Sequence, residues 1–169
     1  MSLYFFKSHI GILGILEHEE KITRIFFQVD NIPDDLEIRE TPLTRETSRQ
    51  LDAYFSGKLQ EFSVPINPTG TDFMRNVWAV LRRIPYGETA SYKEVAAQVG
   101  NPNASRAVGL ANNRNPIPII IPCHRVIGSN GQLVGFRSGL DAKQRLLDLE
   151  AKFRKKYTAA GMGGILRPQ

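Results

Sequence analysis

The stretch Asn-Pro-Ile-Pro-Ile-Ile-Ile-Pro-Cys-His-Arg-Val, residues 115–126, organises this chain of 169 residues. It contains Cys123, the single cysteine of the sequence, and His124, one of three histidines. The run before Cys123 is short, apolar and interrupted by prolines, which predicts a buried extended segment rather than a helix. Pro122 disfavours the helical region for the residue before it, so we expect the chain to reach Cys123 extended and to turn there.

A thiol followed by an imidazole and a guanidinium has the groups that an activated nucleophile needs. The thiolate is the reactive form, and nearby cations lower a cysteine pKa from about 8.5 to roughly 3.5–7.5. These groups make Cys123 a candidate nucleophile and His124 a candidate base. Neighbouring side chains of an extended chain point to opposite faces, so a bridging water is expected between them. A buried structural cysteine beside an incidental histidine is the alternative, and the pair alone does not decide between the two.

The composition, with 41% hydrophobic and 23% charged residues, is typical of a soluble globular protein. No apolar run approaches the ~20 residues needed to cross a bilayer, and the N-terminus lacks the pattern of a signal peptide. One cysteine excludes an internal disulfide and any multi-cysteine zinc site, so we expect no metal and no cofactor. A single thiol also fits a reducing compartment, and we expect a cytoplasmic protein without membrane association.

Charge is distributed unevenly along the chain. Residues 1–70 hold 7 Lys and Arg against 11 Asp and Glu, a net charge of −4, whereas residues 71–169 hold 15 against 6, a net charge of +9. A strongly basic half is expected in a protein that binds a polyanion such as DNA, because each phosphate that is neutralised releases counterions and so favours binding. Many basic surfaces are merely solvated, so charge by itself leaves a nucleic-acid partner undecided.

The first half predicts an antiparallel sheet and one helix. Two runs rich in apolar and β-branched residues, 11–16 and 21–29, are joined by a polar turn. Thr41-Pro42 is typical of a helix start, and Gly57 of a helix end. The predicted buried face of this helix comprises Leu43, Thr47, Leu51, Tyr54 and Phe55. Turn-forming residues in 64–70 place a domain boundary there, between a scaffold domain, 1–70, and a second domain, 71–169.

The second half predicts three helices before the cysteine. Thr71 caps the first, which ends near residues 84–87. Ser91 and Glu94 have capping-box spacing at the start of the second, and a turn at residues 100–102 leads into the third, at residues 103–111. A short helix pair with a glycine-containing turn predicts a helix-turn-helix, whose second member enters a DNA groove.

The third predicted helix is built of small residues, namely Ala104, Ser105, Ala107, Gly109 and Ala111. Small side chains allow close approach of a helix backbone to a narrow groove such as the minor groove. Tight packing between helices is an equally good interpretation of this pattern. A final helix is expected over Leu140 to Leu149, after a loop at residues 135–139. The predicted fold class is thus α/β (α+β): an antiparallel-sheet domain with a helix, followed by a mostly helical domain with the helix-turn-helix and the active-site strand.

Pro-Cys-His-Arg-Val, with Asn-Pro-Ile-Pro-Ile-Ile-Ile before it and Gly-Ser-Asn-Gly after it, closely resembles the active-site signature of the O6-alkylguanine-DNA alkyltransferases. These are also called methylated-DNA–protein-cysteine methyltransferases. The resemblance extends from about Asp72 to Glu150 and is looser over the first seventy residues. Some relatives carry a zinc ion in the N-terminal part, but its cysteines are missing here.

The resemblance implies that Cys123 takes the methyl group of O6-methylguanine, leaving a thioether, so that the protein acts once. It implies a relay in which His124 is the base, through water, and Glu150 orients the imidazole; without the resemblance, Glu150 would be interpreted as a solvated acid. Asn115 matches the asparagine that ties the helix pair to the active-site strand. Tyr92 matches a tyrosine that crowds the flipped nucleotide's phosphate and donates a proton to the departing guanine.

Because the damaged base is stacked in a duplex, it must be flipped into a pocket. The resemblance implies that Arg106 fills the space that the base leaves. Phe136 stands where relatives often have tyrosine, so a polar contact is lost; Arg137 replaces a small residue of some relatives and could alter tolerance for bulky alkyl groups. The expected DNA-contacting residues are Arg106, Tyr92, Ser91, Lys93, Ala104, Ser105 and Ala107. The expected pocket residues are Phe136, Val126, Arg137 and Ser138.

The resulting prediction is a monomer that repairs double-stranded DNA by stoichiometric transfer from O6-alkylguanine, with O4-alkylthymine as a further candidate substrate. Two alternatives remain open. A non-catalytic lesion-binding regulator would share this architecture, although such proteins replace the cysteine that is retained here as Cys123. A thiol hydrolase using Cys123 and His124 would need an oxyanion hole and would leave the helix pair without a purpose.

Overall fold

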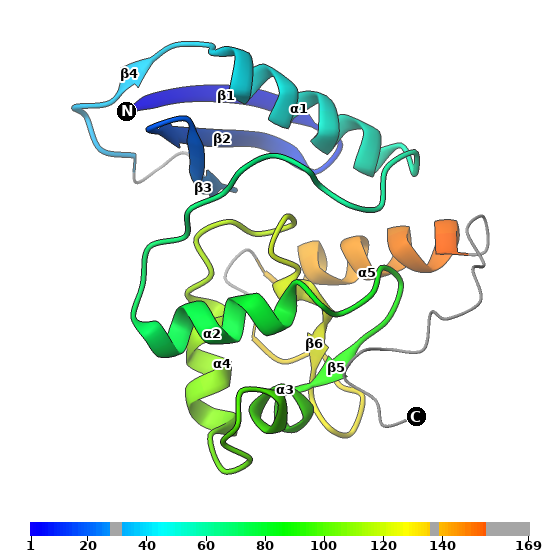
Figure 1. The fold of residues 1–169 in the computed structure, drawn as a ribbon. Helices are drawn as coiled ribbons and strands as arrows, with labels where there is room; N and C mark the ends of the chain where they lie inside the picture. Colours follow the sequence, from blue (N-terminus) through cyan, green and yellow to red (C-terminus); the bar gives the residue numbers. More distant parts are fainter. Residues whose placement is uncertain (28–31, 136–138, 155–169) are drawn as a thin grey trace. The chain divides into compact units, whose positions relative to one another are not determined.

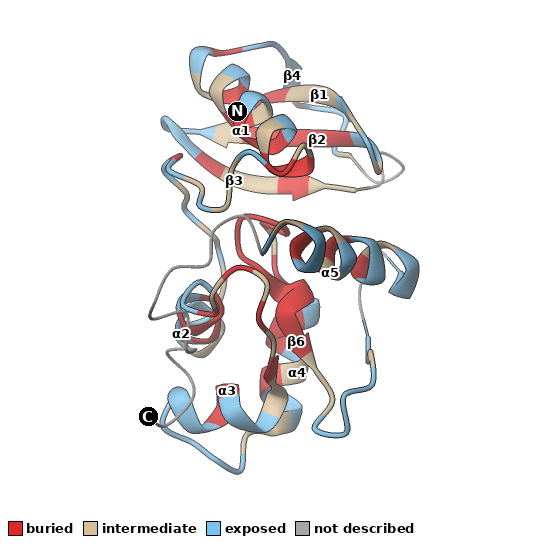
Figure 2. Ribbon diagram, turned by 90° about the vertical axis from the view of Figure 1, so that its right-hand side faces the viewer, coloured by how far each residue is buried: buried red, intermediate tan, exposed pale blue. Residues whose placement is uncertain are grey.

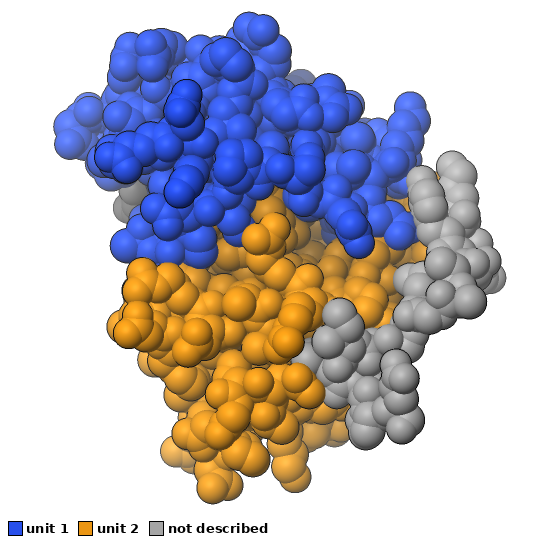
Figure 3. Space-filling view, viewed as in Figure 1, with its two compact units in different colours: residues 1–69 blue, residues 70–169 orange. Residues whose placement is uncertain are grey.

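The computed structural model describes residues 1–27, 32–135 and 139–154. The chain divides into two compact units, residues 1–69 and 70–169, which are coloured separately in Figure 3. Among the helices of the described residues, none has the length and apolar character to cross a bilayer. The expected pocket residues Phe136, Arg137 and Ser138 lie outside the described residues.

The first unit is built on a four-stranded sheet with the strand order β3-β2-β1-β4. β1 (Ser2–Ser8), β2 (Gly11–His18) and β3 (Lys21–Phe26) form an antiparallel meander, and β4 (Glu37–Ile38) pairs with β1 in parallel (Figure 1). The predicted antiparallel sheet is confirmed, although β1 and β4 were not predicted as separate strands. The polar turn before β3 is a tight one, with Glu19 and Glu20 both at positive φ.

Helix α1 (Pro42–Phe55) packs against β1 and β2 of this sheet. Its start follows the prediction: the Thr41 hydroxyl accepts from the backbone N–H of Thr44, and Pro42 occupies the first turn. Gly57, at φ +74°, allows the chain to leave the helix in a left-handed conformation. The buried side chains of α1 are Thr44, Thr47, Gln50, Leu51, Tyr54 and Phe55.

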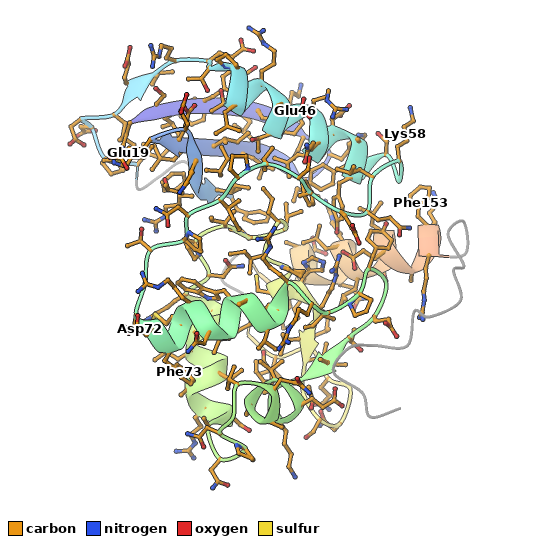
Figure 4. The ribbon with its side chains drawn as sticks, in the orientation of Figure 1. Glu19, Glu46, Lys58, Asp72, Phe73 and Phe153 are labelled. Carbon is orange, nitrogen blue, oxygen red and sulfur yellow. The ribbon has the colours of Figure 1, made fainter. Side chains whose placement is uncertain are left out.

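The second unit contains α2 (Asp72–Leu81), α3 (Tyr92–Gln98) and α4 (Ser105–Asn113), which pack on one another, and the longer α5 (Leu140–Arg154). Thr71 caps α2 by accepting from Met74 N–H at 3.1 Å, and Figure 4 shows Asp72 and Phe73 at this end of the helix. Trp78 lies in the core of this unit: it is 2% exposed and its indole N–H donates to the Ala111 carbonyl at 2.9 Å.

The segment before Cys123 is buried as predicted, but the prediction that it is extended is wrong. The Ile121 N–H donates to the Ile117 carbonyl at 2.9 Å, Ile119 has φ +74°, and Cys123–Arg125 form a 3-10 turn, η1. The three prolines at 116, 118 and 122 lack the N–H groups that a sheet partner would require. Asn115 closes the turn instead, donating to Ile121 O at 2.8 Å and accepting from Ile117 N–H at 3.0 Å.

A two-stranded parallel ladder joins this turn to the helix pair. Strand β6 (Val126–Ile127) follows η1 directly, and β5 (Ala90–Ser91) directly precedes α3. Ala90 pairs with Val126, and Ser91 with Ile127. In Figure 2 the segment around β6 is buried, whereas α5 is buried along one side and exposed along the other. The start of α3 is thus fixed by backbone hydrogen bonds to the residues that follow the cysteine.

Candidate active site

Cys123 opens the turn η1 in the interior of the second unit. It is a free thiol and is only 6% exposed. Its N–H donates to Ile121 O at 2.8 Å, and its carbonyl accepts from Asn112 Nδ2 at 3.3 Å. The sulfur is therefore held on a backbone that is hydrogen-bonded on both sides.

Burial raises the pKa of the Cys123 thiol to about 11, against the opposing effects of an Asn115 hydrogen bond and the positive charge of Lys143. The expectation that neighbouring cations lower this pKa below its ordinary value is thus wrong for the resting protein. The physical reason is desolvation of the sulfur, which raises the pKa more than the nearby positive charge lowers it. The resting group is a thiol, and a base is needed to remove its proton.

His124 is fully buried, and its Nε2 lies 2.6 Å from Glu150 Oε2. Burial lowers the pKa of His124 even though Glu150 acts to raise it, so the resting imidazole is neutral. With its proton on Nε2, shared with the carboxylate, Nδ1 carries the free lone pair. Nδ1 is buried and has no hydrogen-bond partner in the described part of the protein, which makes it the nitrogen that can accept a proton.

Glu150, on α5, is the centre of a buried ion cluster. Arg125 donates to both of its carboxylate oxygens, at 2.8 and 3.0 Å, and the Gly87 N–H donates to it at 3.1 Å. Burial acts to raise the pKa of Glu150, but His124 and Arg125 together hold this pKa well below its usual range. Arg125 is fixed in turn by the Ile84 carbonyl, at 2.7 Å. Glu150 therefore remains a carboxylate that orients His124.

Tyr92 and Lys143 meet at one backbone carbonyl. The Tyr92 hydroxyl donates to Val134 O at 2.9 Å, and Lys143 Nζ donates to the same oxygen at 3.1 Å and to Val126 O at 2.6 Å. Burial raises the pKa of Tyr92, and the Cys123 charge acts in the same direction. Tyr92 is thus close enough to the sulfur to sense its ionisation, and its hydroxyl is a donor at neutral pH.

The helix pair presents a polar and small-residue face to solvent. Arg106, Ala107 and Lys93 are exposed, and Leu110 of α4 is 49% exposed, while Ser91, Ala104 and Ser105 are partly buried. Ser91 caps α3 by accepting from Glu94 N–H at 3.0 Å. The α position of Gly109 faces the Tyr92 ring, since a Cβ there would lie 3.8 Å from two ring carbons. Small residues on α4 therefore serve both helix packing and an open surface.

Comparison with known proteins identifies the family. Residues 72–152 match the model described as 6-O-methylguanine DNA methyltransferase, DNA binding domain, and residues 1–68 match its ribonuclease-like domain. A methylated-DNA–protein-cysteine methyltransferase of Methanosarcina acetivorans is 52% identical over 86% of this chain and 95% of its own length. The chain belongs to the 6-O-methylguanine DNA methyltransferase family.

Other members of this methyltransferase family match this chain along most of its length. The constitutive enzyme of Bacillus subtilis is 46% identical over 83% of this chain and 90% of its own length. The crystal structure of Mycobacterium tuberculosis OGT in complex with DNA superposes with a TM-score of 0.84 and 42% identity, covering 90% of this chain and 94% of that one. The predicted family and fold class are confirmed.

The structure of this methyltransferase brings the residues that were predicted to be catalytic together around the cysteine. His124 and Glu150 are in direct contact, Asn115 supports the turn that carries Cys123, and Val126 is buried beside that turn. Arg106 is on the exposed face of α4, separate from this buried cluster.

Three residues around the cysteine were not predicted as partners in the site, namely Gly87, Asn112 and Lys143, and the ion pair of Arg125 with Glu150 was not predicted either. Lys143, Leu146 and Glu150 are all buried and have helical i, i+3, i+7 spacing on α5. A lysine in line with a leucine and the predicted glutamate is the sequence signal that points to Lys143. Nothing comparable marks Gly87, which reaches Glu150 from a loop 63 residues away.

Proposed function

We propose that this protein repairs DNA by moving the alkyl group of O6-alkylguanine to Cys123 in a single turnover. The observation that carries the proposal is that Cys123, His124 and Glu150 are all buried and that the Nε2 atom of the neutral His124 imidazole is hydrogen-bonded to the Glu150 carboxylate. This arrangement supplies a nucleophile, a base and an orienting group. Its relatives named methylated-DNA–protein-cysteine methyltransferase support the same reaction.

The reaction is a displacement at the alkyl carbon. His124 Nδ1 accepts the thiol proton through a bridging water, and Cys123 Sγ then forms a bond to the methyl carbon as the bond from that carbon to guanine O6 breaks. The electron pair of the broken bond stays on the guanine, which takes up a proton donated by Tyr92. The thioether has no group beside it that can hydrolyse it, so the protein is consumed.

Access to the base requires that it leave the duplex. In the proposal the helix pair α3 and α4 contacts DNA, and Arg106, exposed on α4, fills the space that the base leaves. The Mycobacterium tuberculosis protein, whose structure was solved in complex with DNA, supports DNA as the partner. Phe136, Arg137, Ser138 and Val126 would line the pocket for the flipped base.

Tyr92 has to change partners during this cycle. Its hydroxyl donates to Val134 O in the free protein, at 2.9 Å, and it must turn to a guanine nitrogen to act as the proton donor. Lys143 keeps the same carbonyl satisfied at 3.1 Å, so the exchange leaves no buried acceptor without a donor. The hydroxyl is therefore available to the substrate at small cost.

The two units have different roles in this proposal. Residues 1–70 form a scaffold, and residues 71–169 carry DNA binding and chemistry. A working thiol that must stay reduced fits a cytoplasmic protein. Binding of one lesion by one active site requires only a monomer.

Titration with duplex DNA carrying O6-methylguanine tests the proposal. One methyl group should be transferred per protein chain, with no second turnover. Cys123→Ala should bind the DNA and transfer nothing, because the nucleophile is missing while the helix pair is intact. Tight binding without transfer by the unmodified protein would instead support a lesion-binding regulator, and repeated turnover would support a hydrolase.

A further inference from the structure

The loop between α2 and β5 is held against α5 at two successive turns of that helix (Figure 1). Gly87, in this loop, donates its N–H to Glu150 Oε1 at 3.1 Å, and its carbonyl accepts from Arg154 Nη1 at 3.3 Å. Glu150 and Arg154 have i, i+4 spacing and therefore lie on the same face of α5. Both backbone polar groups of one loop residue are thus hydrogen-bonded to neighbouring side chains of a single helix.

Arg154 also packs directly on Gly87. A Cβ at position 87 would lie 2.9 Å from both Cγ and Cδ of Arg154 and 3.1 Å from its Cβ, which is closer than side-chain atoms normally approach. Gly87 has φ +78°, a left-handed conformation that glycine adopts without strain. The glycine therefore allows the loop to come into contact with the aliphatic stem of Arg154.

The guanidinium of Arg154 lies near a carboxylate of the same loop. Its Nη2 is 3.7 Å from Glu88 Oε1, and the Glu88 side chain is only 4% exposed, whereas that of Arg154 is 45% exposed. A nearby positive charge stabilises a buried carboxylate. Arg154 therefore contacts the loop through its stem, through a hydrogen bond and through its charge.

We propose that Arg154 is a positioning residue for alkyl transfer, which keeps the Gly87 N–H on the Glu150 carboxylate. This inference rests on the proposed function. The Gly87 N–H shares Glu150 Oε1 with Arg125 Nε, at 2.8 Å, so the loop and η1 together fix the carboxylate. Glu150 Oε2 in turn lies 2.6 Å from His124 Nε2, so a rotation of the carboxylate would change the orientation of the imidazole that acts as the base.

Arg154→Met removes the guanidinium and keeps an apolar stem. Single-turnover transfer from duplex DNA that contains O6-methylguanine should become about threefold to tenfold slower, the fold-change expected from the loss of one hydrogen bond. Arg154→Lys keeps a stem and a charged donor, so it should restore most of the rate. Arg145→Met is the matched control, because Arg145 is exposed on the same helix and pairs with the exposed Asp141; its transfer rate should be unchanged.

The proton on His124 Nε2, observed by NMR of the free protein, separates positioning from a merely structural role. Its chemical shift depends on the hydrogen bond to Glu150 and not on the global stability of the fold. The resonance should move in Arg154→Met and return toward its original position in Arg154→Lys. An unmoved resonance or an unchanged transfer rate in Arg154→Met would overturn the inference, even if thermal unfolding shows a lower midpoint.

The packing of Arg154 on the loop is tested by a pair of substitutions. Gly87→Ala should lower the urea midpoint, and it should lower it less when combined with Arg154→Ala, which removes the Cγ and Cδ atoms that the new methyl group would meet. Equal losses in the two backgrounds would contradict the contact. If the unmodified protein takes no methyl group from DNA, the proposed function fails; if Arg154→Met transfers as fast as the unmodified protein, only the role of Arg154 fails.

Discussion

At the scale of single residues, the site depends on one carboxylate that accepts several hydrogen bonds. Glu150 accepts from Arg125 and from the Gly87 N–H, and it holds the Nε2 proton of His124. Two of these donors come from η1 and the third from the loop after α2, so Glu150 joins the end of α5 to both segments. Tautomer selection at His124 and the folding of this region are therefore linked through a single side chain.

Glu150→Gln should lower both stability and transfer. The amide cannot neutralise the buried Arg125, and breaking a buried pair costs about 3–5 kcal/mol of unfolding free energy. The transfer rate should fall at least about tenfold, since His124 loses the group that fixes its tautomer. Urea unfolding and single-turnover transfer measure the two effects. Asp148→Asn, exposed on the same helix, should change stability by less than about 0.5 kcal/mol; equal stability of the two variants would contradict this role of Glu150.

At the scale of secondary-structure elements, backbone pairing connects the helix pair α3 and α4 to the segment that contains Cys123. The β5–β6 ladder pairs Ser91, the cap of α3, with Ile127, four residues after Cys123. Gly109 of α4 lies against the Tyr92 ring at the start of α3. A short stretch of paired backbone thus links the start of α3 to the residues that follow the buried cysteine.

Arg106→Ala should weaken repair of a duplex more than transfer from the free base O6-methylguanine. The arginine is exposed on α4 and is proposed to act only when a base leaves the stack, a step that the free base does not require. Single-turnover rates with both substrates provide the comparison. Arg145→Ala serves as the control, because it removes one positive charge from an exposed position on α5. Equal losses of rate with both substrates for Arg106→Ala would count against the assignment.

Much of the element structure could be predicted because its signals are local. Thr41, Thr71 and Ser91 each cap the helix that was predicted to follow them. The turn at Ile119 could not be predicted from local signals. Its positive φ is not marked by a glycine, and the turn is held by Asn115 and flanked by prolines. Local patterns also miss partners from distant segments, such as the Gly87 N–H on Glu150 or the carbonyls that surround Lys143.

At the scale of the whole molecule, the residues of the proposed chemistry belong to the second compact unit. The buried groups with shifted pKa values, from Tyr92 to Glu150, all belong to residues 70–169. The first unit contributes the acidic half of the chain and none of the buried site residues described above. Buried ionisable groups make the stability of the second unit sensitive to pH.

Acidification should destabilise the protein in two stages. The pKa of His124 is lowered from an ordinary value of 6.5, so the stability that its neutral form contributes is present above that pH and is lost as pH falls below it. The pKa of Glu150 is lowered from 4.5, so a further loss begins below about that pH. Urea midpoints measured between neutral pH and pH 3 should fall in this way, and Glu150→Gln should flatten the lower stage. An unchanged midpoint across this range would contradict the buried cluster.

The most direct test of the central claim is to locate the transferred methyl group by mass spectrometry of peptides, after incubation with duplex DNA that contains O6-methylguanine. We predict a single methyl on the peptide that carries Cys123, with fragment ions placing it on the sulfur, and none on any peptide of Cys123→Ala. A methyl group found on another residue, or a Cys123 peptide left unmodified while the DNA is repaired, would contradict the assignment of Cys123 as the acceptor.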